Sequence, residues 1–377
     1  MNNPAVGGGY NTSQLEVGVY HPQGGLKKST SLRGVYASLD GYLSAPGFIV
    51  GLKKPARLSE MRIVVVGPGA LGSLFAATLV MHSQDAEEGD GRHEVWLLDH
   101  NSSRARQFAA EGLLLERGGE KYVCPVRATT EPGDIGSTDL VLLCVKSYDV
   151  ASGLDRAAAL LGPDTLLLGL QNGIVHLPLL EALADDHLVA IGVTAQGAAL
   201  LAPGHVRHGG RGLTRVGFLR PSTADGAARL RDVAATLAAG GLETEIVDNM
   251  QVHVWAKLFV NAGINALTAI HGCRNGDLLD MPEVRAQLVK VVREAAAVAG
   301  ALVIPIVADP VAATLEVCRA TAENISSMLQ DVRHQRPTEI DAINGAIVEH
   351  GHRLQVPVPA NELLVRKVKE IEADYLL

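Results

Sequence analysis

Short runs of consecutive apolar residues alternate with helical patterns over residues 61–248. Residues 62–66 (Arg-Ile-Val-Val-Val) are rich in β-branched side chains, as a strand buried on both faces of a parallel sheet requires. Further runs of this kind fall at residues 94–98, 140–145, 165–170 and 188–193. Because buried strands that alternate with helices form βαβ units, the pattern predicts an α/β domain with a doubly wound (Rossmann) sheet over residues 61–248.

The pattern changes near residue 249 to long helical periods with few strand signals. We therefore expect an all-helical second domain over residues 249–377. The longest apolar stretch, residues 295–308, is interrupted by Pro305 and is too short to span a bilayer. No membrane partner is expected.

Residues 1–60 differ in composition from the rest of the chain. They contain a run of three glycines at residues 7–9 and a Ser-Thr-Ser cluster at residues 29–31, without a sustained period. This is typical of a disordered N-terminal extension, although short strands at residues 17–20 and 48–52 are an alternative. We assign the extension no chemistry.

The overall composition is that of an ordinary globular protein, with 47% hydrophobic and 20% charged residues. Lys and Arg number 33 against 41 Asp and Glu, a net charge of −8. An acidic chain without a dense basic run is a poor candidate for binding nucleic acid. The four cysteines form no C-x-x-C pair, and no secretory signal is visible. We therefore expect reduced thiols and a cytoplasmic location.

A glycine-rich segment follows the first strand and precedes a helix expected from Ser73. Its first glycine permits a tight turn, its second lets the backbone approach a pyrophosphate, and its third lets helix and strand pack closely. The phosphates would face the positive end of the helix dipole. Since the motif lies between a strand and a helix, we prefer nucleotide binding to a glycine-rich turn without a ligand. The candidate cofactor-binding residues are Gly67, Pro68, Gly69, Ala70, Leu71 and Gly72.

The end of the second strand bears on the choice of nucleotide. An acidic residue there accepts hydrogen bonds from a ribose 2′-OH, whereas an arginine accommodates a 2′-phosphate. Asp99 at this position argues for NAD, and Arg104 and Arg106 just beyond it keep NADP open. The residues alone leave both cofactors possible.

Two later strands end in polar residues, at the edge of the sheet where a cofactor would lie. Lys146 could reach cofactor oxygens, and Asn172 could donate to a carboxamide or to a substrate. Each has a plain structural alternative: a solvated charge at a strand end for the lysine, and a common Asn-Gly turn for the asparagine.

Lys257, Asn261 and Asn265 are spaced i, i+4, i+8 and share one face of a predicted helix. The surrounding segment is apolar, so this face is expected to line a cleft rather than to meet bulk water. Desolvation would lower the pKa of the lysine toward the range useful for an acid. The two amides could bind hydroxyl or carboxylate oxygens of a substrate.

A second polar group lies further along the chain. Asn324 and Ser327, three residues apart, could hold a carboxylate, and Glu339 could accept from a hydroxyl or orient Lys257. The alternative is helix capping by Thr338 and ordinary surface polarity. The paired histidines elsewhere lack the carboxylate or cysteine neighbours that a metal site needs, so no metal is predicted.

Taken together in this order, the motifs of residues 61–377 resemble those of the ketopantoate reductase (2-dehydropantoate 2-reductase) family. The resemblance rests on G-P-G-A-L-G at residues 67–72, V-K at 145–146, Q-N-G at 171–173, W-x-K-L-x-x-N-x-x-x-N at 255–265, S-S-M-L-Q-D-V at 326–332 and T-E-I-D-x-I-N-G at 338–345.

The resemblance implies reduction of 2-dehydropantoate to (R)-pantoate in pantothenate biosynthesis, with NADPH as cofactor and Lys257 as the general acid. It implies cofactor binding by the glycine loop, Lys146, Asn172 and Glu339. It implies substrate binding by Lys257, Asn261, Asn265, Asn275, Asn324 and Ser327. Two departures from the family pattern are Asp99, which keeps NADH open, and the extension of residues 1–60, which has no counterpart.

Two other functions stay open from the sequence. One is a related NAD(P)H-dependent 2-oxo acid reductase with a different substrate, and the other is a non-catalytic nucleotide-sensing protein of the same fold. The expected partner is the small-molecule substrate, and a homodimer is left open.

Overall fold

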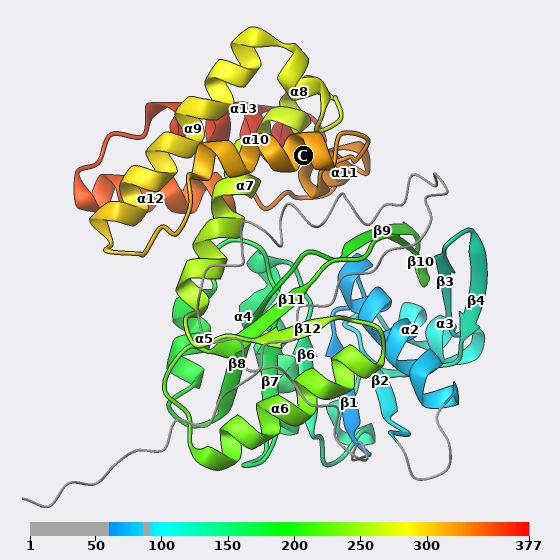
Figure 1. The fold of residues 1–377 in the computed structure, drawn as a ribbon. Helices are drawn as coiled ribbons and strands as arrows, with labels where there is room; N and C mark the ends of the chain where they lie inside the picture. The colour runs from blue at the N-terminus through cyan, green and yellow to red at the C-terminus, as the bar shows by residue number, and fades with distance from the viewer. Residues whose placement is uncertain (1–59, 86–90, 377) are drawn as a thin grey trace, which may run out of the picture. The chain divides into compact units, whose positions relative to one another are not determined.

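The core of the α/β region is an eight-stranded sheet of order β12-β11-β8-β7-β6-β1-β2-β5 (Figure 1). All neighbouring strands run parallel except β11, which is antiparallel to β8. The structure is a computed structural model and describes residues 60–85 and 91–376. The extension predicted to be disordered therefore lies, except for Glu60, outside the described residues. The strands are β1 (Arg62–Val66), β2 (Glu94–Leu98), β5 (Arg127–Thr129), β6 (Leu140–Leu143), β7 (Leu166–Gly169), β8 (Leu188–Thr194), β11 (Thr214–Phe218) and β12 (Thr244–Ile246).

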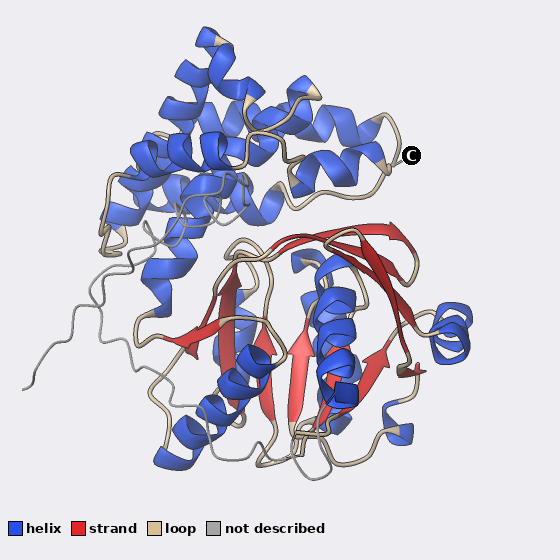
Figure 2. Ribbon diagram, turned by 45° about the vertical axis from the view of Figure 1, so that its right-hand side comes forward, coloured by secondary structure: helices blue, strands red, loops and turns tan. Residues whose placement is uncertain are grey.

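Alternate side chains of the central strands face two separate hydrophobic clusters, because successive residues of a strand point to opposite faces. Ile63 and Val65 of β1 pack with α2 (Ala70–Asp85) and α6 (Ala224–Ala239). Val64 and Val66 belong to the other cluster, with α4 (Val150–Ala157) and α5 (Leu177–Leu183). Helices thus cover both faces of the sheet (Figure 2), which confirms the predicted doubly wound fold.

A second, four-stranded sheet of order β4-β3-β10-β9 was not predicted from the sequence. Its strands are only partly buried. Polar residues interrupt residues 120–124 and 205–210, whereas the apolar run at residues 197–202 (Gly-Ala-Ala-Leu-Leu-Ala) is rich in alanine, a residue depleted in strands. They are β3 (Leu113–Arg117), β4 (Glu120–Cys124), β9 (Gly197–Ala202) and β10 (His205–Gly210). The α/β region also contains α3 (Ser102–Glu111) and the short 3₁₀ helices η1 (Pro132–Asp134), η2 (Ser147–Asp149) and η3 (Ala158–Leu160).

The C-terminal region is helical in the structure, as predicted. Its central helix α7 (Met250–His271) contacts β8 and β11 at the sheet and packs against α9, α10, α11 and α13 (Figure 1). The predicted division into domains at residues 61–248 and 249–377 stays a prediction. The other elements are α8 (Asp277–Asp280), α9 (Pro282–Ala301), α10 (Pro310–Ala320), α11 (Ser327–Arg333), the π-helical turn η4 (Asp341–Gly345), α12 (Ala346–Leu354) and α13 (Pro359–Ala373).

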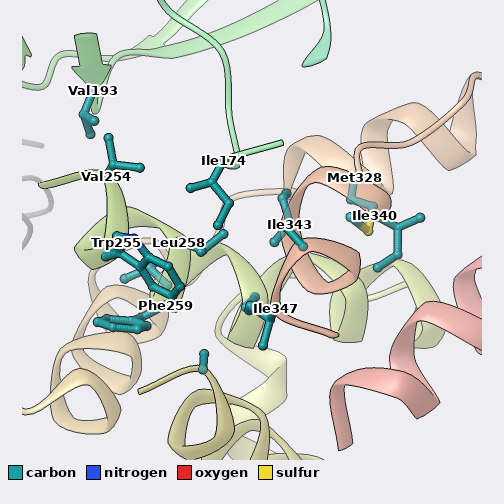
Figure 3. Close-up of a cluster of buried hydrophobic side chains, with 14 of the residues drawn as sticks. Ile174, Val193, Val254, Trp255, Leu258, Phe259, Met328, Ile340, Ile343 and Ile347 are labelled. Atoms are coloured by element: carbon teal, nitrogen blue, oxygen red, sulfur yellow. The ribbon is translucent and has the colours of Figure 1, made fainter. Parts of the chain in front are cut away.

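One hydrophobic cluster continues from the sheet into the helical region. Figure 3 shows Val193 of β8 beside Val254 of α7, and Ile174 close to Leu258 and to Ile343 of η4. This shared core fixes the position of α7 relative to the carboxyl ends of the parallel strands, where ligands bind in such folds. Within the part of the chain that the structure describes, each helix falls short of the length or apolar character that a membrane span needs.

Candidate active site

The glycine loop joins β1 to α2, and its three glycines meet three different steric demands. Gly67 has φ +89°, and a Cβ there would lie 2.6 Å from Val145 Cγ1. A Cβ on Gly72 would lie 2.3 Å from the carbonyl oxygen of Gly67. A Cβ on Gly69 would have no atom within 4 Å. Gly69 therefore faces open space, as a backbone that a pyrophosphate approaches must do.

This open space is a cavity of about 800 Å³ between the glycine loop and the helical region. Its volume lies within the range of roughly 300–1,000 Å³ of known ligand pockets, and the glycine loop supplies backbone N–H groups at a helix N-terminus. The residues therefore fit a dinucleotide, and we call this cavity the cofactor cleft. Of the predicted residues, those that line it are Gly67, Pro68, Gly69, Ala70, Leu71, Lys146, Asn172, Lys257, Ser327 and Glu339.

The buried Asp99 and the partly exposed Arg104 form an ion pair at one end of the cleft. The guanidinium donates to both carboxylate oxygens, from Nε at 2.5 Å and from Nη2 at 2.5 Å, and the backbone N–H of Asn101 donates at 3.1 Å. Burial raises the pKa of Asp99, but the bonds from Arg104 and Asn101 outweigh it and hold the pKa below its usual value. Arg104 and His100 line the cleft, whereas Arg106 bonds to the exposed Ser103.

Glu339 gathers three donors from the α/β region. Its carboxylate accepts from the backbone N–H of Ser147 at 3.1 Å, from Asn172 Nδ2 at 3.1 Å and from Lys146 Nζ at 3.4 Å. Burial raises the pKa of Glu339, but Lys146 and these hydrogen bonds lower it by more than burial raises it, so the net shift is downward. Glu339 is thus a carboxylate that holds Lys146 and Asn172, two other predicted cofactor residues, in place.

Lys146 is held between two carboxylates of the helical region. Besides Glu339, its Nζ donates to Asp331 Oδ2 at 2.6 Å. Burial lowers the pKa of Lys146, but Glu339 and Asp331 raise it by more, so the side chain is a fixed cation in the cleft. Asp331 was missed by the sequence analysis, although it lies in the motif at residues 326–332.

Lys257 lies where three cavities meet. It lines the cofactor cleft, a second cavity of about 130 Å³ and a third of about 20 Å³. Its Nζ donates to the carbonyl oxygen of Thr194 at 3.0 Å. Burial lowers the pKa of Lys257 to about 8, against the opposing effect of Glu339. The lysine can therefore act as a proton donor near neutral pH.

The second cavity, here the amide pocket, is lined by three of the predicted asparagines: Asn261, Asn265 and Asn275. Asn275 Nδ2 donates to Thr321 Oγ1 at 2.9 Å, while Asn275 Oδ1 is buried and has no hydrogen-bond partner among the described residues. Apolar residues, among them Val260, Ile264 and Val317, also form part of its wall. Thr321 was not singled out from the sequence.

Not all predicted substrate residues meet at this pocket. Ser327 lines the cofactor cleft instead. Asn324 is exposed and lines none of the three cavities. Its backbone carbonyl accepts from the backbone N–H of Asn275 at 3.1 Å. Among residues 60–85 and 91–376, no three His, Cys, Asp or Glu side chains gather as a metal site requires.

Comparison with known proteins identifies the family. The family described as ketopantoate reductase PanE/ApbA matches residues 63–221, and its C-terminal part matches residues 249–372. The chain is 35% identical to the 2-dehydropantoate 2-reductase of Halobacterium salinarum over 83% of this chain and 100% of that protein. It belongs to the ketopantoate reductase family. A 2-dehydropantoate 2-reductase of Vibrio cholerae is 34% identical over 84% of this chain and 99% of its own.

Solved structures share the fold. A PanE/ApbA family ketopantoate reductase from Ralstonia eutropha superposes with a TM-score of 0.74 at 32% identity, covering 84% of this chain and 100% of its own. The structure of D-mandelate dehydrogenase with NADH and anilino(oxo)acetate superposes with a TM-score of 0.75 at 26% identity, covering 84% of this chain and 100% of its own. As a ketopantoate reductase family member, the chain is an oxidoreductase acting on CH–OH groups with a nicotinamide cofactor. The predicted family and enzyme class are confirmed.

Proposed function

We propose that the protein reduces the C2 ketone of 2-dehydropantoate to (R)-pantoate, a step in pantothenate biosynthesis, with NADPH as cofactor and Lys257 as general acid. The observation that carries this proposal is the place of Lys257, which lines both the cofactor cleft and the amide pocket. A ketone that lies between these cavities would have the Lys257 ammonium within reach. The names of the relatives support the same substrate.

The glycine loop, Lys146 and Asn172 would hold the cofactor. A nicotinamide held there would supply a hydride. Lys257 donates a proton from Nζ to the ketone oxygen as that oxygen becomes a hydroxyl. Its positive charge also stabilises the negative charge that develops on the oxygen, an effect larger in the transition state than in the ground state. The Thr194 carbonyl holds the ammonium in place.

The amide pocket favours a substrate that carries a hydroxyl group. Asn275 Oδ1 is buried without a donor among the described residues, and a buried acceptor is costly unless it is paired. The 4-hydroxyl of 2-dehydropantoate can donate to this acceptor. The two methyl groups of the same substrate suit the apolar side chains of Val260, Ile264 and Val317.

The Asp99–Arg104 pair supports NADPH. The carboxylate of Asp99 already accepts hydrogen bonds from Arg104 and Asn101, so it is not a free acceptor for a ribose 2′-OH. Arg104 bonds Asp99 through Nε and Nη2, which leaves Nη1 and its two hydrogens for a 2′-phosphate. Since the pair is neutral overall, we expect a modest preference for NADPH over NADH.

A second candidate is the reduction of another 2-oxo acid. The similar fold of D-mandelate dehydrogenase, with anilino(oxo)acetate bound, and the apolar wall of the amide pocket favour it. The deciding assay follows nicotinamide oxidation with 2-dehydropantoate, its analogue without the 4-hydroxyl, and an aryl 2-oxo acid. Clearly faster turnover of 2-dehydropantoate supports the proposal, and preference for the aryl acid overturns it.

The variant Asn275→Ala sharpens this assay. It should weaken the binding of 2-dehydropantoate by roughly 1–3 kcal/mol, the value of a bond to a buried polar group. The binding of the analogue without the hydroxyl should be almost unchanged. Asn249→Ala, in an exposed residue that lines none of the three cavities, is the matched control. If both substrates lose the same binding free energy, the 4-hydroxyl does not bind to Asn275.

A further inference from the structure

The third cavity lies between α7, the end of β7 and the loop before α5. Its lining includes Gly169, Gln171, His176, Val254 and Lys257. Its volume of about 20 Å³ is enough for one water molecule, which needs about 10–15 Å³ on this measure, and far too small for a substrate. A water there also needs two to four polar partners, and the lining supplies them.

Gln171 lines this cavity and carries an unpartnered acceptor. Its Nε2 donates to the carbonyl oxygen of Leu143 at 2.6 Å and to that of Val145 at 3.4 Å, which fixes the orientation of the amide. Its Oε1 is buried and has no hydrogen-bond partner among the described residues. A Cβ on Gly169 would lie 3.0 Å from this oxygen, so the glycine leaves the space beside it open.

His176 contributes a second unpartnered atom. The residue is only 4% exposed, and its Nδ1 is buried without a partner in the described part of the chain. Burial lowers the pKa of His176 to about 4, although Glu339 opposes the shift. The ring is therefore neutral at neutral pH, and a neutral imidazole has one nitrogen that accepts a hydrogen bond.

Lys257 has N–H groups that the described residues do not use. An ammonium has three N–H groups, and the carbonyl of Thr194 takes one of them. The ketone of the substrate would take the second. The third remains for the small cavity.

We propose that this cavity binds one water molecule, which donates to Gln171 Oε1 and His176 Nδ1 and accepts from Lys257 Nζ. His176 and Gln171 are then positioning residues that act on Lys257 through the water. Two acceptors use both hydrogens of the water, so its lone pair must face the lysine. The role of Lys257 as the acid rests on the proposed function, whereas the water site rests on the cavity and its unpartnered atoms.

This arrangement has a measurable electrostatic effect. A hydrogen bond accepted from the ammonium favours the charged form of Lys257 and opposes the desolvation that lowers its pKa. The titratable groups that face Lys257 among the described residues are His176, from the loop before α5, and Glu339, from the segment before η4. Lys146 also lines the cleft but is paired with Asp331 and Glu339.

The test measures the pKa of Lys257 by NMR of the full chain labelled with ε-¹³C lysine, without cofactor or substrate. His176→Leu should lower this pKa by about one unit through the lost hydrogen bond, and His176→Asn, whose Oδ1 can replace Nδ1, should restore it. His93→Leu is the matched control, because His93 is also buried with a pKa of about 4 and lines none of the three cavities.

An unchanged pKa in His176→Leu, or equal shifts in the Leu and Asn variants, would overturn the proposal. Because the measurement needs no turnover, it stands even if 2-dehydropantoate proves not to be the substrate. A crystal structure of the native protein is the second measurement, should His176→Leu not fold. An ordered water bonded to Gln171, His176 and Lys257 supports the proposal, and an empty cavity refutes it.

Discussion

At the scale of single residues, Asp99 and Arg104 show what a sequence leaves undecided. As residue types they argue for opposite cofactors. In the structure they are one unit, because the guanidinium of Arg104 reaches back from α3 and binds both oxygens of Asp99. Their spacing of five residues could not show this, since the contact depends on where the helix begins after β2. The residue types of the site were predictable, but their pairing was not.

Arg104→Ala should therefore change cofactor preference in two ways at once. It removes the cation for a 2′-phosphate and frees the Asp99 carboxylate, which repels that phosphate and accepts from a 2′-OH. The ratio of kcat/KM for NADPH to that for NADH should fall at least about tenfold, or ~1.4 kcal/mol. Arg106→Ala, whose side chain lies outside the cleft, should leave the ratio unchanged. A similar fall in both variants would contradict this assignment.

Lys257→Ala should reduce kcat by about 10²-fold or more, the scale of losing a positioned acid, with nucleotide affinity nearly native. In the native protein the pKa of Lys257 is about 8, and the acid must be protonated to act. The kcat should therefore be constant below this pKa and fall as pH rises through it. A pH profile of kcat at saturating substrate checks this fall at high pH. If the same fall persists in Lys257→Ala, the titrating group is another residue.

At the scale of elements, two motifs that are far apart in the sequence meet through their backbones. The backbone N–H of Ile174 donates to the carbonyl of Ala342 in η4 at 3.2 Å. A Cβ on Gly173, which has φ +78°, would lie 2.1 Å from that same oxygen. The sequence indicated a turn at Asn172-Gly173, but a π-helical turn has no such signature. This contact sets Asn172 opposite Glu339.

Gly173→Ala should push these two segments apart and weaken the Asn172–Glu339 bond. We expect a loss of stability larger than the roughly 1 kcal/mol of a positive φ alone, together with a raised KM for the cofactor. Gly119→Ala is the matched control, because Gly119 has φ +89° and nothing within 4 Å of its Cβ position. Chemical denaturation and steady-state kinetics of both variants give the comparison. Indistinguishable variants would mean that the contact with Ala342 is unimportant.

At the scale of the whole molecule, the central strands β1, β2, β6, β7 and β8 of the main sheet were predictable because most of their side chains are buried. Such strands are continuous apolar runs, as in Leu140–Leu143. The other strands of the main sheet, β5, β11 and β12, and the four strands of the second sheet were not predicted. β5 and β12 have only three residues each, and β3, β4, β9 and β10 are only partly buried. The link between Lys146 and Asp331 spans 185 residues, and no local pattern could indicate it. The sequence therefore predicted the layers and the cleft, and the structure supplied the contacts across it.

Acid should destabilise the fold through its buried histidines. His93, His176 and His253 each have a pKa lowered from 6.5 to about 4 by burial. Between these values the unfolded chain binds protons that the native protein does not. The free energy of unfolding should thus decrease as pH falls from 6.5 toward 4, by up to about 1.4 kcal/mol per pH unit for each histidine. Urea denaturation at several pH values should show a shallower slope for His93→Leu, and an unchanged slope would rule His93 out.

The carboxylates that hold Lys146 and Asn172 also come late in protein synthesis. Asp331 follows Lys146 by 185 residues, and Glu339 follows Asn172 by 167. At about 5–20 residues per second, a ribosome needs roughly 10–40 s to cover such a distance. During that interval the sheet can form while the lysine is still a solvated cation and the asparagine loop has no partner. The cofactor cleft of a nascent chain would be completed only as its last helices emerge.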